Sequence, residues 1–108
     1  MSDMSPSEAV RRMREENLIL VDVREDYEWE AGRPAGATHI PLSALAGEVS
    51  LPSDRPVDFI CLAGMRSRQA TEAFRGRGYD AHNVVGGFQA WFDAGLPTEP
   101  ENARLMPH

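Results

Sequence analysis

The sequence contains no lysine, because all 11 of its basic residues are arginine. This absence excludes Schiff-base chemistry on a lysine amine and a phosphate-binding loop that needs a Gly-Lys pair. The chain has one cysteine, Cys61, and so cannot form an internal disulfide bond. It also lacks an apolar run of membrane-spanning length, and its first residues show no secretory signal pattern. We therefore expect a soluble protein of the reducing cytoplasm.

The overall composition restricts the partners further. The formal net charge of −6 argues against nucleic acid or an anionic membrane as a partner. The histidines His39, His82 and His108 show no metal-ligand spacing with Cys61, so we expect neither a metal nor another cofactor. A chain of 108 residues fits one domain, 1–108, with a core over about 5–97 and an extended C-terminal tail over 98–108.

Short apolar runs alternate with helical patterns along the chain, which predicts an α/β fold. Because the runs are apolar on both faces, the strands should form a mainly parallel sheet with helices on both of its faces. The expected strands lie within 1–4 and at 18–23, 38–40, 57–61 and 79–85. The expected helices cover about 5–16, 24–31, 42–46, from the loop after Cys61 to about Gly76, and 88–94.

This topology brings three loops to the carboxyl edge of the sheet, namely those after Val23, Cys61 and Val85. Binding sites of open parallel sheets form at this edge. Asp22 and Arg24 lie beside the first of these loops, where they can support a site. A local ion pair that braces the loop is the preferred interpretation, because buried charges usually pair.

The central stretch of the chain runs from Val57 to Ser67. It reads as a buried strand, a tight loop that contains Gly64, and the start of a helix. A thiol at a helix N-terminus lies near unpaired N–H groups and the positive end of the helix dipole, both of which favour the nucleophilic thiolate. The alternative is that Cys61 is only a small buried apolar residue, as free cysteines often are.

Four blocks of sequence, taken together, resemble a single-domain rhodanese-like sulfurtransferase over roughly residues 8–97. They are Leu20-Val21-Asp22-Val23-Arg24-Glu25, the segment 32–41, Cys61-Leu62-Ala63-Gly64-Met65-Arg66-Ser67, and Val85-Gly86-Gly87-Phe88-Gln89-Ala90-Trp91 followed by Gly95-Leu96-Pro97. The third block matches the family pattern C-x-x-G-x-R-S throughout. The second departs from it, with Arg33-Pro34-Ala35 in place of the usual His-Ile-Pro, which affects a scaffold turn and the charge near the site entrance.

The resemblance implies a rhodanese-like α/β fold, with an open twisted, mainly parallel five-stranded sheet and helices on both faces. It also implies transfer of sulfane sulfur through a persulfide on Cys61. The donor would be a small anion such as thiosulfate, and the acceptor cyanide, a thiol or a protein. The persulfide-binding loop would comprise Leu62, Ala63, Gly64, Met65, Arg66 and Ser67, with Asp22, Arg24, Gly86 and Gly87 in support.

Physical chemistry agrees with these roles. The N–H groups of residues 62–67 can surround a persulfide anion, and Gly64 allows the tight loop. Arg66 can bind an anionic donor and departing sulfite, or it can be a surface helix arginine; as an exposed loop residue it should affect the donor step more than stability. Ser67 can cap the helix or contact substrate.

Gly86 and Gly87 should allow their loop to approach closely. Trp29 can border the pocket or join the core, and Trp91 should lie in the core.

Two other functions compete with this one. Phosphatases and arsenate reductases on the related fold use Cys-x5-Arg, a loop one residue longer, whereas the arginine here falls at Cys-x4-Arg. Hydrolysis of a phosphorylated substrate without sulfur transfer would favour that class. The second competitor is a rhodanese-like regulatory module or sulfur carrier; the presence of Cys61 in an intact loop favours chemistry, but a carrier that serves one protein partner stays open.

Overall fold

The computed structural model describes residues 3–45, 47 and 49–107. Five parallel strands form one sheet, in the order β1-β6-β5-β2-β4. Their bounds are β1 Asp3–Met4, β2 Ile19–Asp22, β4 Thr38–His39, β5 Val57–Ile60 and β6 Ala81–Val84. The predicted α/β fold with a mainly parallel five-stranded sheet is therefore confirmed. Of the expected first strand and the expected helix 42–46, residues 1–2 and Ala46 lie outside the described residues.

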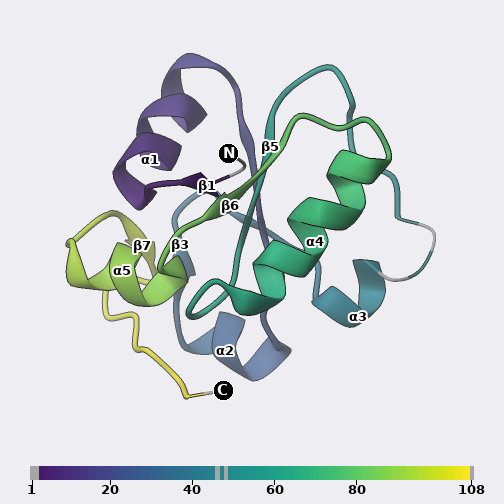
Figure 1. The fold of residues 1–108 in the computed structure, drawn as a ribbon. Helices are drawn as coiled ribbons and strands as arrows, with labels where there is room; N and C mark the ends of the chain where they lie inside the picture. Colours follow the sequence, from purple (N-terminus) through teal and green to yellow (C-terminus); the bar gives the residue numbers. More distant parts are fainter. Residues whose placement is uncertain (1–2, 46, 48, 108) are drawn as a thin grey trace.

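Helices cover both faces of this sheet, as Figure 1 shows. On one face, α1 (Pro6–Glu15) and α5 (Gly87–Asp93) bury a core that includes Leu20, Ile60 and Trp91. On the other face, α3 (Leu42–Leu45) and α4 (Met65–Gly76) bury a second core around Phe59 and Phe74. Trp91 is 1% exposed, which confirms its predicted place in the core.

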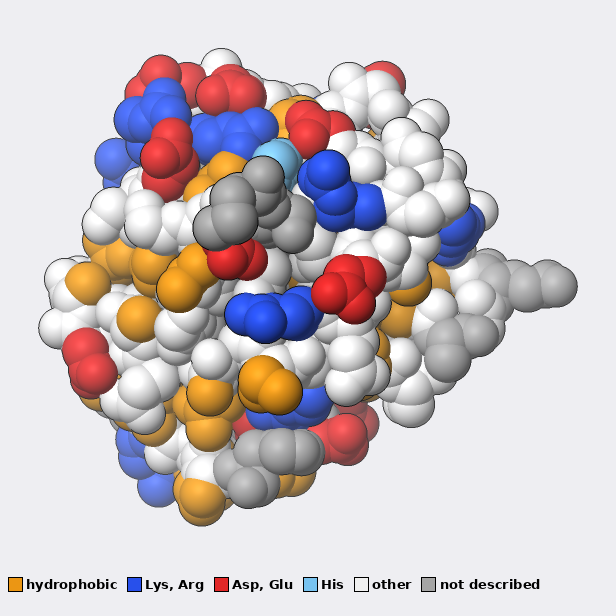
Figure 2. All heavy atoms as spheres, in the orientation of Figure 1, with side chains coloured by type: hydrophobic (Ala, Val, Ile, Leu, Met, Phe, Trp, Pro, Cys, Tyr) orange, Lys and Arg blue, Asp and Glu red, His pale blue; other side chains and the backbone are white. Residues whose placement is uncertain are grey.

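Local signals explain where the first helix begins. The Ser5 hydroxyl accepts a hydrogen bond from the Glu8 N–H at 3.2 Å, and Pro6 occupies the first turn, as expected of an N-cap followed by proline. Acidic and basic side chains alternate over α1, and Figure 2 shows them gathered there. These exposed pairs stabilise the helix only slightly.

A second, smaller sheet was missed by the sequence analysis. Strand β3 (Arg33–Pro34) pairs antiparallel with β7 (Thr98–Glu99), where the sequence suggested a turn and a tail. The following residues also contact the domain: the Arg104 N–H donates to the Ala31 carbonyl at 2.9 Å, and the Ala103 side chain packs on Gly32. Pairs of two residues leave no hydrophobic periodicity, so sequence patterns cannot reveal them. No helix among the described residues is long and apolar enough to span a membrane.

Candidate active site

The carboxyl ends of the central strands meet α2 (Asp26–Ala31) and the starts of α4 and α5 at one end of the sheet (Figure 1). Cys61 follows β5 directly, and Gly64 is the N-cap of α4 with a left-handed φ of 108°. A glycine suits that backbone conformation because it has no Cβ. A pocket of about 420 Å³ is lined by Cys61, Leu62, Ala63, Met65 and Arg66. The thiol is 1% exposed and borders this opening.

Two donors lie against the Cys61 sulfur. The Gly64 N–H donates to Sγ at 3.0 Å, and the Ser67 hydroxyl lies 3.3 Å from the same atom. The N–H groups of the first turn of α4 lie beside them without intrahelical acceptors, as at any helix start. A negative charge on the sulfur, or on a second sulfur bound to it, is stabilised by such donors.

Ser67 is not the cap of α4, which was one of its two expected roles. Gly64 occupies the N-cap position, and Ser67 is the third helical residue. Its side chain is fully buried, and its hydroxyl lies near Cys61 Sγ, the Gly64 carbonyl and the side chain of Asn83. The serine therefore contacts the Cys61 sulfur rather than the open end of the helix.

Asn83 is a site residue that sequence reasoning missed. It lies on β6 and is 2% exposed, and its amide nitrogen donates to the Gly64 carbonyl at 3.3 Å. Its amide oxygen accepts a short hydrogen bond from Ser67. The available signal was a polar residue close to the carboxyl end of an expected strand, near the edge where the site forms.

The loop after β6 packs directly on the cysteine loop. The Phe88 N–H donates to the Cys61 carbonyl at 2.7 Å, and the Gln89 N–H donates to the Leu62 carbonyl at 3.0 Å. A Cβ added to Gly87 would collide with both carbonyl oxygens, and Gly87 has a left-handed φ of 58°. The close approach expected of the Gly86-Gly87 pair is thus present in the structure.

Arg66 is not the exposed arginine that the sequence suggested. Its side chain is 15% exposed, and two of its nitrogens donate to the fully buried carboxylate of Glu28 on α2, at 2.7 and 3.0 Å. Desolvation by burial acts to raise the pKa of Glu28, but the hydrogen bonds from Arg66 and from the Glu25 N–H outweigh it and lower that pKa. Because Arg66 also lines the pocket, this pair connects α2 to the mouth of the site.

Asp22 and Arg24 form the predicted local ion pair. Both side chains are fully buried, and Arg24 Nη2 lies 2.8 Å from Asp22 Oδ2. Arg24 also donates to the Gly32 carbonyl at 2.7 Å, and its guanidinium lies 4.4 Å from the centre of the Phe88 ring. The pair therefore fixes the loop after β2 against the end of α2 and against α5.

The histidines and Trp29 have structural partners. His39 Nε2 lies 2.8 Å from the Arg24 carbonyl oxygen, and its ring stacks on Trp29 with 4.7 Å between centroids. His82 pairs with Asp80 at 2.8 Å, while His108 lies outside the described residues. Trp29 neither lines the Cys61 pocket nor is fully buried. Within residues 3–45, 47 and 49–107, no group of three or more His, Cys, Asp or Glu could bind a metal ion.

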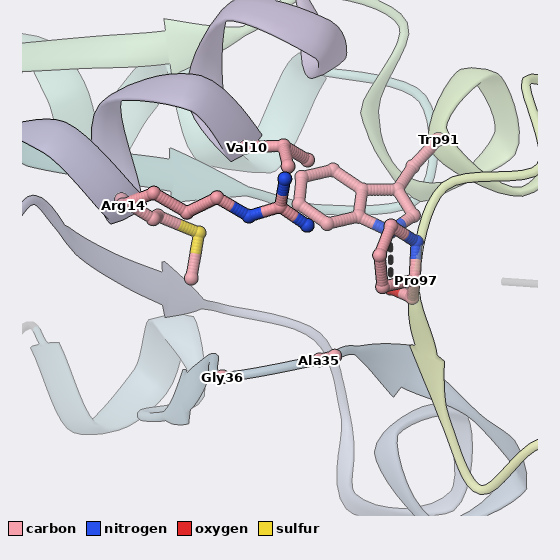
Figure 3. Close-up of a pocket in the computed structure, with 7 residues that line it drawn as sticks. Val10, Arg14, Ala35, Gly36, Trp91 and Pro97 are labelled. Carbon is pink, nitrogen blue, oxygen red and sulfur yellow. Dashed lines mark hydrogen bonds between the residues drawn. The ribbon is translucent and has the colours of Figure 1, made fainter.

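A second pocket, of about 360 Å³, lies between α1, the β3–β4 turn and Trp91 (Figure 3). Its lining residues are Val10, Met13, Arg14, Ala35, Gly36, Trp91 and Pro97. The Trp91 indole N–H donates to the Pro97 carbonyl at 2.8 Å, which is the dashed line in the figure. This lining includes no nucleophile and no acid.

Known proteins resemble this chain over nearly its whole length. It is 34% identical over 101 residues to the thiosulfate sulfurtransferase GlpE of Actinobacillus succinogenes, a match that covers 91% of this chain and 90% of the relative. It is 36% identical over 89 residues to the putative sulfurtransferase YtwF of Bacillus subtilis, covering 82% of this chain and 84% of that one. The crystal structure of a rhodanese-related protein from Thermoplasma volcanium superposes with a TM-score of 0.86 at 28% identity, covering 94% of this chain and 100% of that one.

The family comparison agrees with these relatives. The model of the rhodanese-like domain matches residues 5–94. This match includes the cysteine loop, the Glu28–Arg66 pair and Asn83. The chain therefore belongs to the rhodanese-like domain family, with sulfurtransferases among its relatives.

Proposed function

We propose that this protein is a sulfurtransferase that carries sulfane sulfur on Cys61 from a small anionic donor to a nucleophilic acceptor. One observation carries the proposal: the Cys61 sulfur borders an open pocket and accepts a hydrogen bond from the Gly64 N–H at 3.0 Å, at the start of α4. A thiolate in this position is stabilised by the loop and helix amides. Thiosulfate is the proposed donor, because one similar protein carries the name thiosulfate sulfurtransferase.

The reaction proceeds in two displacements. The Cys61 thiolate attacks the outer sulfur of thiosulfate, so that the Sγ–S bond forms while the S–S bond of the donor breaks and sulfite leaves with its electron pair. The acceptor, which can be cyanide, a thiol or a protein thiol, then attacks the outer sulfur. The Sγ–S bond breaks, and its electron pair returns to Sγ as the thiolate.

Each loop residue has a role in this scheme. The backbone of residues 62–67, which are Leu62, Ala63, Gly64, Met65, Arg66 and Ser67, supplies the donors around the transferred sulfur. Arg66 lies at the pocket, oriented by Glu28, where a guanidinium can bind the departing sulfite. Asp22, Arg24, Gly86 and Gly87 fix the neighbouring loops against it. We place the reaction in the cytoplasm, where thiols stay reduced.

The test is intact mass spectrometry of the protein after incubation with thiosulfate. We expect one added sulfur atom, removed again by cyanide with release of thiocyanate. Cys61→Ser should gain no sulfur, and because Cys61 is the only cysteine, no other thiol can account for the signal.

Two results would count against the proposal. No added mass with thiosulfate would exclude that donor, and no added mass with cysteine persulfide or polysulfide would exclude the transferase itself. Hydrolysis of an aryl phosphate by the wild type but not by Cys61→Ser, without sulfur transfer, would favour the phosphatase class. Binding of a partner protein with neither activity would indicate a regulatory module.

A further inference from the structure

The side chain of Asn83 lies behind the Cys61 loop, on a different strand from the nucleophile. Its nitrogen donates to the Gly64 carbonyl, and its oxygen accepts from Ser67, whose hydroxyl in turn lies 3.3 Å from Cys61 Sγ. The side chains of Cys61, Ser67 and Asn83 are all buried, at 2% exposure or less. A chain of contacts between buried side chains therefore leads from β6 to the Cys61 sulfur.

The carbonyl of Gly64 determines which way the Asn83 amide points. A carbonyl only accepts hydrogen bonds, so the NH₂ group of Asn83 must face Gly64, and the amide oxygen must face Ser67. Ser67 has a single hydroxyl proton but lies near three acceptors: Asn83 Oδ1, Cys61 Sγ and the Gly64 carbonyl oxygen. It can donate fully to only one of them at a time, so Asn83 and Cys61 compete for the same proton.

The charge on the sulfur decides this competition. A hydrogen bond to a thiolate is stronger than one to a neutral amide oxygen, whereas a neutral or sulfur-bonded Sγ is a weak acceptor. We propose that Asn83 is a positioning residue for sulfur transfer: it accepts the Ser67 hydroxyl while Sγ is uncharged and loses it to Sγ when the thiolate forms.

This inference rests on the proposed function for its place in the reaction. In the persulfide, Sγ is bonded to the outer sulfur, and the Ser67 hydroxyl donates to Asn83. When the acceptor attacks the outer sulfur, the Sγ–S bond breaks and its electron pair moves to Sγ. The hydroxyl then turns to the new charge. Without Asn83, the buried hydroxyl would lose this acceptor in the persulfide, so the discharged thiolate would be relatively more favoured.

Replacement of Asn83 does not leave the Gly64 carbonyl without a hydrogen-bond donor. The Gly64 carbonyl also accepts from the Arg68 N–H at 3.2 Å, so it keeps a partner when the amide is removed. The charged group that interacts with Cys61 is Arg66 on α4, which is paired with Glu28. Neither of these residues is altered in the variants below.

The experiment compares the wild type with Ser67→Ala, Asn83→Leu and the double variant. The readout is the pH midpoint of the ultraviolet thiolate absorbance, which reports Cys61 alone because the chain has one cysteine. Ser67→Ala should raise this midpoint by about one pH unit, the scale of a hydrogen bond to a charged group. Asn83→Leu should lower it by about half a unit, and it should have no effect in the Ser67→Ala background.

A matched control tests whether any buried hydroxyl would act in this way. Thr71 is fully buried one turn further along α4, and its hydroxyl donates to the Ser67 carbonyl at 2.8 Å. Thr71→Val should lower the melting temperature and leave the thiolate midpoint unchanged. In the sulfur-transfer assay, Asn83→Leu should discharge its persulfide to a fixed thiol about threefold faster than the wild type, and Ser67→Ala more slowly.

Several outcomes would overturn the inference. A midpoint that rises in Asn83→Leu, or one that shifts equally with and without Ser67, would make Asn83 only a packing residue. Asn83→Ala, which removes the same amide by truncation and puts no apolar group in its place, should shift the midpoint in the same direction and replaces the leucine variant if that one does not fold. Because the thiolate absorbance needs no sulfur donor, this test separates failure of the Asn83 role from failure of the sulfurtransferase proposal.

Discussion

Buried ionisable groups at the two ends of β5 have different surroundings. At the carboxyl end, Cys61 lies among donors, and the nearby carboxylate of Glu28 receives two hydrogen bonds from Arg66. Three residues earlier, Asp58 is equally buried, yet neither of its oxygens has a hydrogen-bond partner among the described residues. Burial raises its pKa to about 7, and Arg12 on α1 only partly opposes this effect.

The difference shows where this fold arranges polar partners. Asp58 lies in register with Leu20 and His82 and faces the core beneath α1. There the surrounding side chains are mainly apolar, so the acid stays neutral until the pH approaches about 7. At the carboxyl end of β5, by contrast, the hydrogen bonds from Arg66 lower the pKa of the buried Glu28 carboxylate and favour its ionised form. A shared depth of burial therefore does not imply a shared charge state.

Among the variants, removal of Arg66 should cause the largest loss of folding stability. Arg66→Ala removes both hydrogen bonds that the buried Glu28 carboxylate receives from Arg66, and we expect a loss of about 3–5 kcal/mol in the free energy of unfolding. Urea denaturation measures this loss. The control is Arg55→Ala, which removes an exposed pair with Asp54 and should cost less than about 1 kcal/mol. Equal losses in the two variants would contradict the bracing role of Arg66.

A methyl group at position 87 should displace the backbone of the Cys61 loop. Gly87→Ala places a Cβ against the carbonyls of Cys61 and Leu62 at a positive φ, so we expect a loss of about 2–3 kcal/mol together with slower persulfide formation. Gly78→Ala is the matched control, because it also has a positive φ of 93° but meets nothing within 4 Å. A full rate of sulfur transfer in Gly87→Ala would show that the loop tolerates displacement.

Replacement of Asp58 tests the other group of the comparison, the buried acid within β5. The folded pKa of about 7 lies above the usual value of 3.8, so the folded state retains the proton longer than the unfolded state does. Stability therefore falls as pH rises from about 4 through about 7, by up to about 4 kcal/mol. Asp58→Asn removes this dependence, and we expect it to be about 2 kcal/mol more stable than the wild type near pH 9.

The measurement for Asp58 is urea denaturation at about pH 5 and about pH 9. Glu28 has the opposite sign: its lowered pKa means that its contribution is present above the unfolded pKa and is lost as the pH falls through the folded one. Glu28 therefore cannot account for a loss of stability on the alkaline side. If Asp58→Asn were less stable than the wild type at both pH values, Asp58 would have a partner that the apolar surroundings do not suggest.

The smallest effect is expected at the surface of α1. Arg11 lies 2.6 Å from Glu8 and 3.2 Å from Glu15, with about half of each side chain exposed. Because such pairs are screened by solvent, Arg11→Ala should leave the urea midpoint of unfolding almost unchanged. A shift of that midpoint as large as the one in Gly87→Ala would mean that distance from the site is a poor guide to the strength of an ion pair here.

The sequence predicted the sheet, the order of its main elements and the place of Cys61, because these follow from apolar runs, glycine positions and the geometry of parallel strands. The Asp22–Arg24 pair was also predictable, since its members are two residues apart. The Glu28–Arg66 and Ser67–Asn83 pairs were not, because their members are 38 and 16 residues apart and meet only in the folded chain. The same limit applies to Asp58, whose apolar surroundings come from a helix and strands distant in sequence.

The C-terminal segment offers a way to observe the site without touching it. The Tyr27 hydroxyl donates to the Pro107 carbonyl at 3.1 Å, and the next residue of α2 is Glu28, the partner of Arg66. An environment-sensitive dye attached near position 107 would thus be separated from the pocket by one short helix. Its emission could follow loading and unloading of the thiol in real time, with every residue of the reaction loop left unmodified.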